Sequence, residues 1–83
     1  MNKGYQNELV QVFLEAKKAD EMLDLLKGLL TLKEIEELET RLQIVKMLKD
    51  GVSQREIADK LSVGIATVTR GSREIKMGRF KSV

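Results

Sequence analysis

The stretch from Thr31 to Gly51 constrains the fold more than any other part of this 83-residue chain. The residues "TLKE" read as a capping box, in which the Thr31 hydroxyl and the Glu34 carboxylate satisfy free backbone donors at the start of a helix. Asp50 and Gly51 are typical of a helix end, and the whole chain contains no proline. The sequence therefore predicts one long, uninterrupted helix here.

Apolar residues inside this stretch follow helical spacing. They form a continuous stripe of Ile35, Leu38, Leu42, Val45 and Leu48, with Ile44 and Met47 as a second apolar flank. Two shorter helices are expected before it, one over roughly 5–18 with a broad apolar face and one running to about Lys27. Asp20 is the expected N-terminal cap of the latter, and Gly28 is the expected left-handed residue that ends it.

The chain is expected to be all-α. Zero proline and only three aromatic residues, together with abundant Leu, Glu and Lys, suit helices better than strands. A chain of this size buries only about 60% of the surface that its unfolded form exposes, so the apolar faces of residues 1–50 are more than one small domain hides easily. A homodimer is the favoured outlet for that surface, and a monomeric bundle is the alternative.

The composition also excludes several classes of function. Without Cys and His, the chain lacks the ligands of common zinc sites and the usual catalytic base, so neither a metal site nor enzymatic activity is expected. No run of about 18 apolar residues is present, and the first ten residues lack the order of a signal peptide. We expect a cytoplasmic protein without a membrane segment.

The two parts of the chain differ in charge. Residues 1–50 hold 8 Lys/Arg against 10 Asp/Glu, whereas residues 51–83 hold 7 against 3, so the net charges are −2 and +4. The C-terminal part is a candidate for binding a polyanion, and a merely solvated basic tail is the alternative.

Residues 51–78 have the layout of a helix-turn-helix. Its features are, in order, a second capping box (Ser53 and Glu56), apolar Ile57 and Leu61 around the small Ala58, the turn "LSVG" with Gly64 as the next cap, and Val68 returning to the core. A small residue in the first helix allows the second helix to cross it closely. The agreement of several positions in type and spacing makes this motif fairly specific.

The second helix of the motif divides into three stripes on a helical wheel. The inward stripe is Val68, Ser72 and Ile75, the outward stripe is Ala66, Thr69, Arg73 and Lys76, and the third is Thr67, Arg70 and Glu74. The outward stripe is small at its N-terminal end and basic at its C-terminal end, which suits entry into the major groove of DNA. For the third stripe, the plainest interpretation is an ordinary i, i+4 surface ion pair.

The stretch "LLTLKEIEELETRLQIVKMLKDGVSQREIADKLSVGIATVTRGS" resembles the tryptophan (trp) repressor family, most specifically in "SQRE" and "GIATVTRGS". The resemblance implies an intertwined homodimer, a helical bundle with a C-terminal helix-turn-helix, that binds double-stranded DNA at a palindromic operator. It implies a transcriptional regulator that acts as a repressor, with L-tryptophan or another amino-acid-like effector as corepressor. One domain over 1–83 is expected, with dimerisation helices in 1–50, the helix-turn-helix in 51–78 and a tail in 79–83.

The resemblance also implies site residues. Those expected at the DNA are Gln54, Arg55, Ile65, Ala66, Thr67, Thr69, Arg70 and Arg73, with Arg55 as the candidate for a guanine. Those expected at the ligand are Thr31, Arg41, Ile44, Arg70, Gly71 and Glu74, with the carbonyls of Gly28 and Leu30 near the ligand ammonium. Arg41 would meet the ligand carboxylate, and Arg70 would lie against the indole.

Glu74 departs from the family, which has a serine at this position. Its carboxylate either strengthens the hold on the ligand ammonium or pairs with Arg41 or Arg70 and fills the site. The second alternative is favoured, because a longer charged side chain leaves less room for an indole. The family also has a further helix after the recognition helix, whereas this sequence ends at Val83, so a smaller dimer is expected.

Two other classes of function fit the same motif. The helix-turn-helix is also suited to an effector-independent DNA-docking module of a transposase-like or sigma-like system that needs a catalytic partner. A helical interaction module whose basic end only solvates it is the third possibility. DNA binding that falls steeply with salt is expected of the repressor and of the DNA-docking module, and is not expected of the interaction module.

Overall fold

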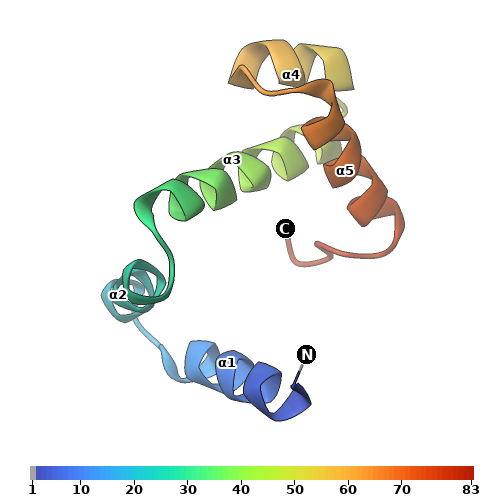
Figure 1. Ribbon diagram of the computed structural model, residues 1–83. Coiled ribbons are helices and arrows are strands. Elements are labelled where there is room, and N and C mark those ends of the chain that lie inside the picture. Colours follow the sequence, from blue (N-terminus) through green and yellow to red (C-terminus); the bar gives the residue numbers. More distant parts are fainter. Residues whose placement is uncertain (1) are drawn as a thin grey trace. The chain divides into compact units, whose positions relative to one another are not determined.

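The computed structural model describes residues 2–83, which form five α-helices and no β-strand (Figure 1). The helices are α1 (Lys3–Glu15), α2 (Ala19–Leu29), α3 (Leu32–Lys49), α4 (Gln54–Leu61) and α5 (Ile65–Lys76). The prediction of an all-α chain is confirmed. The chain forms two compact units, Met1–Ile35 and Glu36–Val83. Within residues 2–83, no helix is both long and apolar enough to cross a membrane.

Helix α1 starts and ends earlier than the predicted range of 5–18. It begins after Asn2, whose Oδ1 accepts a hydrogen bond from the Tyr5 N–H at 3.1 Å. It stops where Ala16 becomes extended, and the Lys17 ammonium donates to the Leu14 carbonyl at 2.6 Å. A cap at the N-terminus and a cation at the last turn thus fix both ends.

The predicted end of α2 at Gly28 is wrong. Asp20 does accept a hydrogen bond from a free amide of the first turn, the Glu21 N–H at 2.9 Å, but it is not the N-cap. The helix begins one residue before Asp20, with Lys18 as its N-cap, and the Glu21 carboxylate reaches back to accept from the Lys17 N–H at 3.3 Å. Gly28 lies inside the helix, which ends when Leu30 becomes extended. Acidic side chains in the first turn therefore do the capping from within, and no left-handed glycine is needed because the next helix starts two residues on.

Both predicted ends of α3 are confirmed. The Thr31 N–H donates to Glu34 Oε1 at 2.9 Å, and the Glu34 N–H donates to Thr31 Oγ1 at 3.1 Å, which is the reciprocal capping box. At the other end Gly51 has φ 85°, and the N–H of Val52 donates to the Met47 carbonyl at 3.0 Å. Gly51 closes the helix because this left-handed conformation carries no penalty without a Cβ.

The capping box makes the stability of α3 depend on pH. Hydrogen bonds from the Thr31 N–H and then the Thr31 hydroxyl lower the pKa of Glu34 below its ordinary 4.5. Stability contributed by this carboxylate is therefore complete above the ordinary pKa and is lost as the pH falls through the lower folded-state value. We expect Glu34→Gln to be less stable than the unchanged chain at pH 7 and to lose less stability on acidification, as measured by urea unfolding from pH 7 to 3. Glu36→Gln is the control, since it removes a carboxylate of the same helix outside the cap, and equal pH profiles for the two variants would contradict the assignment.

The core of the second unit lies where α3, α4 and α5 meet (Figure 1). It consists of Ile44, Ile57 and Val68, one from each helix and each at most 1% exposed. The partly buried side chains around it are Met47, Leu48, Val52, Ala58, Leu61 and Val63. The inward direction of Val68 and the packing of the small Ala58 are confirmed.

The buried face of α3 differs from the predicted stripe. Val45 of the stripe is buried and Leu48 packs against the core, as expected, but Leu38 and Leu42 stay exposed. Ile44, expected on the flank, is in the core. Apolar residues lie on several sides of this helix, and α4 and α5 cover only one of them. None of the residues described in the first unit, 2–35, is buried, so α1 and α2 also carry exposed leucines and valines.

The helix-turn-helix follows the predicted pattern. At the start of α4 the Glu56 N–H donates to Ser53 Oγ at 3.2 Å, which is the forward bond of the second predicted capping box. The turn between α4 and α5 comes next. Ser62 adopts φ 55°, and the Val63 N–H donates to the Ala58 carbonyl at 3.0 Å. Gly64 then serves as the N-cap of α5.

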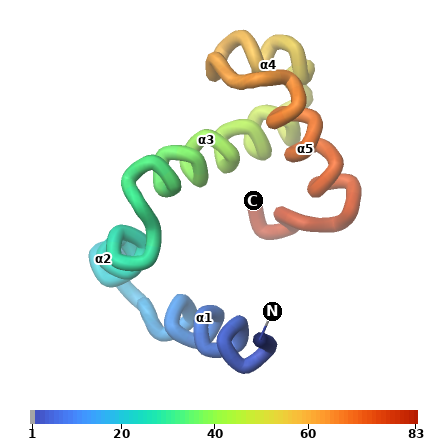
Figure 2. Tube along the Cα trace, viewed as in Figure 1, coloured from blue at the N-terminus to red at the C-terminus, as the bar shows by residue number. Residues whose placement is uncertain are grey.

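Beyond α5 the chain turns back toward α3 (Figure 2), and Lys49 donates a hydrogen bond to the Phe80 carbonyl.

Candidate functional site

The exposed side of α4 and α5 brings together the side chains expected at DNA. Arg55 is exposed in the first turn of α4, and Ile65 is 52% exposed at the first residue of α5. The remaining exposed members are Ala66, Thr67, Arg70 and Arg73, all on α5. The first turn of α5 therefore offers small and β-branched side chains and its later turns offer cations, as groove entry requires.

Gln54 and Thr69 are partly buried and contact each other. The Thr69 hydroxyl lies 2.7 Å from Gln54 Oε1 and 3.0 Å from the Ile65 carbonyl oxygen. A hydroxyl has one proton to donate, so these two acceptors share it. The Gln54 contact joins the first residue of α4 to the middle of α5 and helps to set the angle between the two helices.

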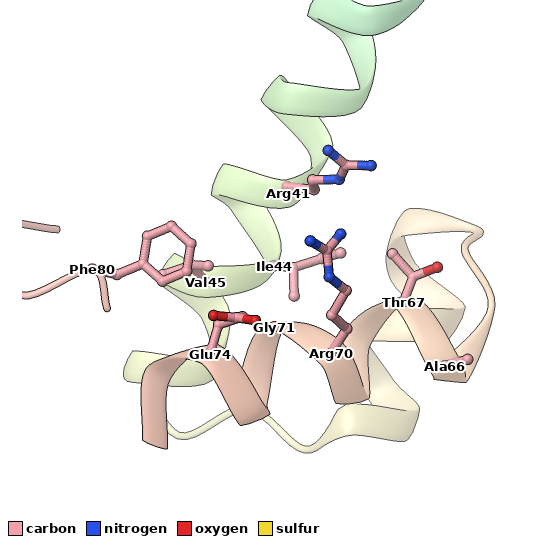
Figure 3. A pocket seen from close by; sticks show the side chains of 9 residues that line it. All are labelled: Arg41, Ile44, Val45, Ala66, Thr67, Arg70, Gly71, Glu74 and Phe80. Carbon is pink, nitrogen blue, oxygen red and sulfur yellow. The ribbon is translucent and has the colours of Figure 1, made fainter. Parts of the chain in front are cut away.

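A pocket of about 440 Å³ lies between α3 and α5 (Figure 3), within the usual size range of small-molecule sites. It is lined by Arg41, Ile44 and Val45 of α3, by Ala66, Thr67, Arg70, Gly71 and Glu74 of α5, and by Phe80. Most of the lining is apolar, and charged groups are carried by Arg41, Arg70 and Glu74. Ala66, Thr67 and Arg70 face this pocket as well as belonging to the set expected at DNA.

The pocket gathers most of the residues expected at a ligand. Arg41, Ile44, Arg70, Gly71 and Glu74, which are up to 33 positions apart in the sequence, all line it. Thr31 belongs to the other unit, where its hydroxyl and N–H are engaged in the capping box of α3.

Gly71 allows α5 to approach α3 closely at the floor of the pocket. A Cβ at this position would lie 3.1 Å from Cγ2 of Ile44, closer than ordinary van der Waals contact. Ile44 is only 1% exposed and has little freedom to move away. The missing side chain thus helps to determine the depth of the pocket.

The charged groups in the pocket have neighbours that the sequence did not indicate. Glu74 Oε2 lies 2.6 Å from Nε of Arg79, so its ion pair is with the segment after α5, and neither Arg41 nor Arg70 is its partner. Arg41 has a looser contact of 3.9 Å with Glu37 on its own helix. The expected filling of the site by a pair of Glu74 with Arg41 or Arg70 is therefore not what the structure has.

Sequence reasoning missed Phe80 and Arg79. Both were assigned to a tail, yet Phe80 lines the pocket and Arg79 pairs with Glu74. The available signal was Gly78, a residue type that commonly reverses the chain after a helix. An aromatic residue two positions after such a glycine is a candidate to fold back onto the helix.

Comparison with a family model and with curated relatives points to one family. The model of the family "Trp repressor protein" matches residues 5–81. A Trp operon repressor homolog of Vibrio vulnificus is 45% identical over 71 residues, covering 84% of this chain and 67% of the relative. Homologs of the same description in Actinobacillus succinogenes (40%, covering 92% of this chain and 76% of the relative) and Xylella fastidiosa (34%, covering 88% and 80%) agree.

The match extends over all of α2 to α5 and includes both the helix-turn-helix and the lining of the pocket. The resemblance seen in the sequence is confirmed. The chain belongs to the Trp repressor family, whose members are DNA-binding regulators of transcription and not enzymes.

Proposed function

We propose that this protein is a homodimeric, sequence-specific repressor that reads a palindromic operator through α4 and α5 and responds to a small amino-acid-like effector. Residues 1–50 supply the dimer contacts, 51–78 the reading head, and 79–83 a short segment that contributes Phe80 to the pocket. The proposal rests mainly on the exposed face of α4 and α5. On α5 this face has small residues in the first turn and cations in the later turns. The core of Ile44, Ile57 and Val68 holds both helices in place.

The DNA-binding assignment is supported by charge and shape together. Residues 51–83 carry a net charge of +4, and Arg55, Arg70 and Arg73 are exposed. A helix whose first turn is slim approaches the base edges closely, and longer cations then reach the phosphates. Arg55 is our candidate for the bidentate guanine contact, and Gln54, Ile65, Ala66, Thr67 and Thr69 complete the reading surface.

The dimer is supported by uncovered apolar surface. The exposed apolar side chains of α1 and α2 include Leu9, Val10, Val12, Leu14, Leu23 and Leu29, and α3 adds Leu38 and Leu42. Large exposed apolar side chains that gather on a helix face are typical of protein–protein interfaces. A two-fold pair covers the same residues on both copies.

Effector control is supported by the pocket. Arg41 and Arg70 offer guanidinium groups to a carboxylate or an aromatic ring, and Ile44 and Gly71 supply an apolar floor. Because α5 forms one wall and also carries the DNA-facing side chains, a ligand in the pocket acts directly on the reading head. L-Tryptophan is the first candidate, since the relatives are described as homologs of the Trp operon repressor.

Operator binding is tested by selecting the tightest palindrome from a random library and measuring gel shifts at physiological salt. We expect Arg55→Ala to reduce discrimination between the selected site and a scrambled one by about 1–3 kcal/mol per head, because each head loses one bidentate base contact. Lys33→Ala, an exposed cation outside the helix-turn-helix, is the matched control and should keep full discrimination. Equal retention of selected and scrambled DNA by the unchanged chain would reject the proposal.

The same assay tests the effector. Adding L-tryptophan at millimolar concentration should tighten binding to the selected site, and Arg70→Gln should abolish that gain. Unaltered DNA binding and no heat of binding in calorimetry would exclude tryptophan as the effector.

A further inference from the structure

The segment after α5 reverses direction through a left-handed glycine. Gly78 has φ 95°, its N–H donates to the Ile75 carbonyl at 3.0 Å, and the Arg79 N–H donates to the Glu74 carbonyl at 3.1 Å. These two bonds close the last turn of α5 and direct the following residues back along the helix. The segment therefore begins from a fixed geometry.

Two side chains then hold the segment. The Arg79 guanidinium is paired with Glu74 on α5 at 2.6 Å, and the Lys49 ammonium of α3 donates to the Phe80 carbonyl. Phe80 itself has φ 62°, a conformation that residues other than glycine adopt uncommonly and that persists where surrounding contacts impose it. Anchors on both walls of the pocket thus determine where the Phe80 ring lies.

The Phe80 ring closes one end of the pocket. In Figure 3 it lies on the side of Val45 and Glu74, whereas Thr67 and the two arginine heads lie away from it. Glu74 is already paired with Arg79, so this end offers an aromatic face beside an ion pair. The other end offers the cations of Arg41 and Arg70. The pocket is accordingly polarised, with two cations at one end and an aromatic ring beside an ion pair at the other.

We propose that Phe80 is a specificity-determining residue of the effector pocket, and that Arg79, acting through Glu74, is the positioning residue that holds it there. A small amino acid held between Arg41 and Arg70 at the cationic end extends toward Phe80, and the ring limits the size of the ligand that fits. This inference rests on the proposed effector function of the same pocket. It assigns a role in ligand choice to residues outside the helix-turn-helix.

The test uses three amino acids with the same head group and increasing side-chain size: L-leucine, L-phenylalanine and L-tryptophan. Binding to the full chain is measured by calorimetry. Phe80→Ala should shift the ratio of tryptophan to leucine affinity by roughly tenfold or more in favour of tryptophan, because lengthening an apolar pocket discriminates by side-chain size. Lys81→Ala, in the same segment but outside the pocket lining, should leave the ratio unchanged.

A second measurement needs no ligand. The chain contains no tryptophan, so F80W introduces a single fluorescent indole. Its emission should be shifted to the blue and partly protected from acrylamide, and adding Arg79→Gln should remove that protection whereas Arg79→Lys retains it. An indole as quenchable as free tryptophan in F80W would overturn the position assigned to Phe80.

The two failures are distinguishable. Binding by the unchanged chain with an affinity ratio that Phe80→Ala does not move would overturn the inference and leave effector control standing. If none of the three amino acids binds the unchanged chain, amino-acid control fails and the specificity role falls with it. A protected indole would then support only the position of the segment.

Discussion

Replacing Ile57 by alanine should destabilise the second unit by about 2–5 kcal/mol, the usual cost of truncating a fully buried isoleucine. The side chain is 0% exposed and packs with Ile44 and Val68, one residue from each of the other two helices. A chain of 83 residues has a total stability of about 4–12 kcal/mol, so the loss is a large share of it. Urea unfolding followed by circular dichroism measures the change.

Ile65→Ala is the matched control for this substitution. Ile65 is of the same residue type and lies in the same motif, but it is 52% exposed at the start of α5. Its truncation should cost well under about 1 kcal/mol, as is usual for surface positions, while weakening DNA binding. Two variants with equal midpoints in urea would contradict the assignment of Ile57 to a core that all three helices share.

Local signals in the sequence were sufficient where the chemistry is local. The capping box of Thr31 and Glu34 and the closing turn at Gly51 involve residues at most five positions apart, and both form as expected. The inward direction of Val68 also follows from helical spacing alone. The sequence therefore predicted the long helix, the helix-turn-helix and its core residue.

Local signals did not predict the end of α2 or the buried face of α3, because the same residues fit more than one arrangement. Gly28 can end a helix, but it also fits inside one, and the capping signal at Thr31 let α2 continue to Leu29. Likewise Ile44 and Leu42 are both apolar, and only the placement of α5 decides which of them is buried. Spacing within α3 carries no information about that placement.

The lining of the pocket was predicted only in part, because some of its contacts depend on how the chain folds back after α5. Family resemblance indicated Arg41, Arg70 and Glu74, and the fold brings them around one cavity. The partner of Glu74 was missed, because Arg79 reaches it only after the chain has left the helix and reversed at Gly78. Helical periodicity does not predict a contact that forms only after a left-handed turn.

Raising the salt concentration from 50 to 200 mM should weaken operator binding by about a thousandfold. Arg70, Arg73 and Lys76 are exposed along α5, and three phosphate contacts in each of two heads release about six counterions, with a log-log slope of about −0.9 per contact. A monomer with three contacts would lose only about 40-fold over the same range, because the slope is halved. The salt dependence measured by fluorescence anisotropy therefore reports on both the phosphate contacts and the number of heads.

Arg73→Gln separates phosphate contacts from base contacts. It removes one phosphate contact per head, so the slope of a dimer should become shallower by about 1.8, and affinity should fall by a similar factor on selected and scrambled DNA. Arg55→Ala should instead weaken binding mainly on the selected site, because a base contact carries the sequence information. Lys33→Gln, a cation outside the helix-turn-helix, should leave the slope as it is. A slope that Arg73→Gln does not alter would mean that this stripe of α5 does not face the DNA backbone.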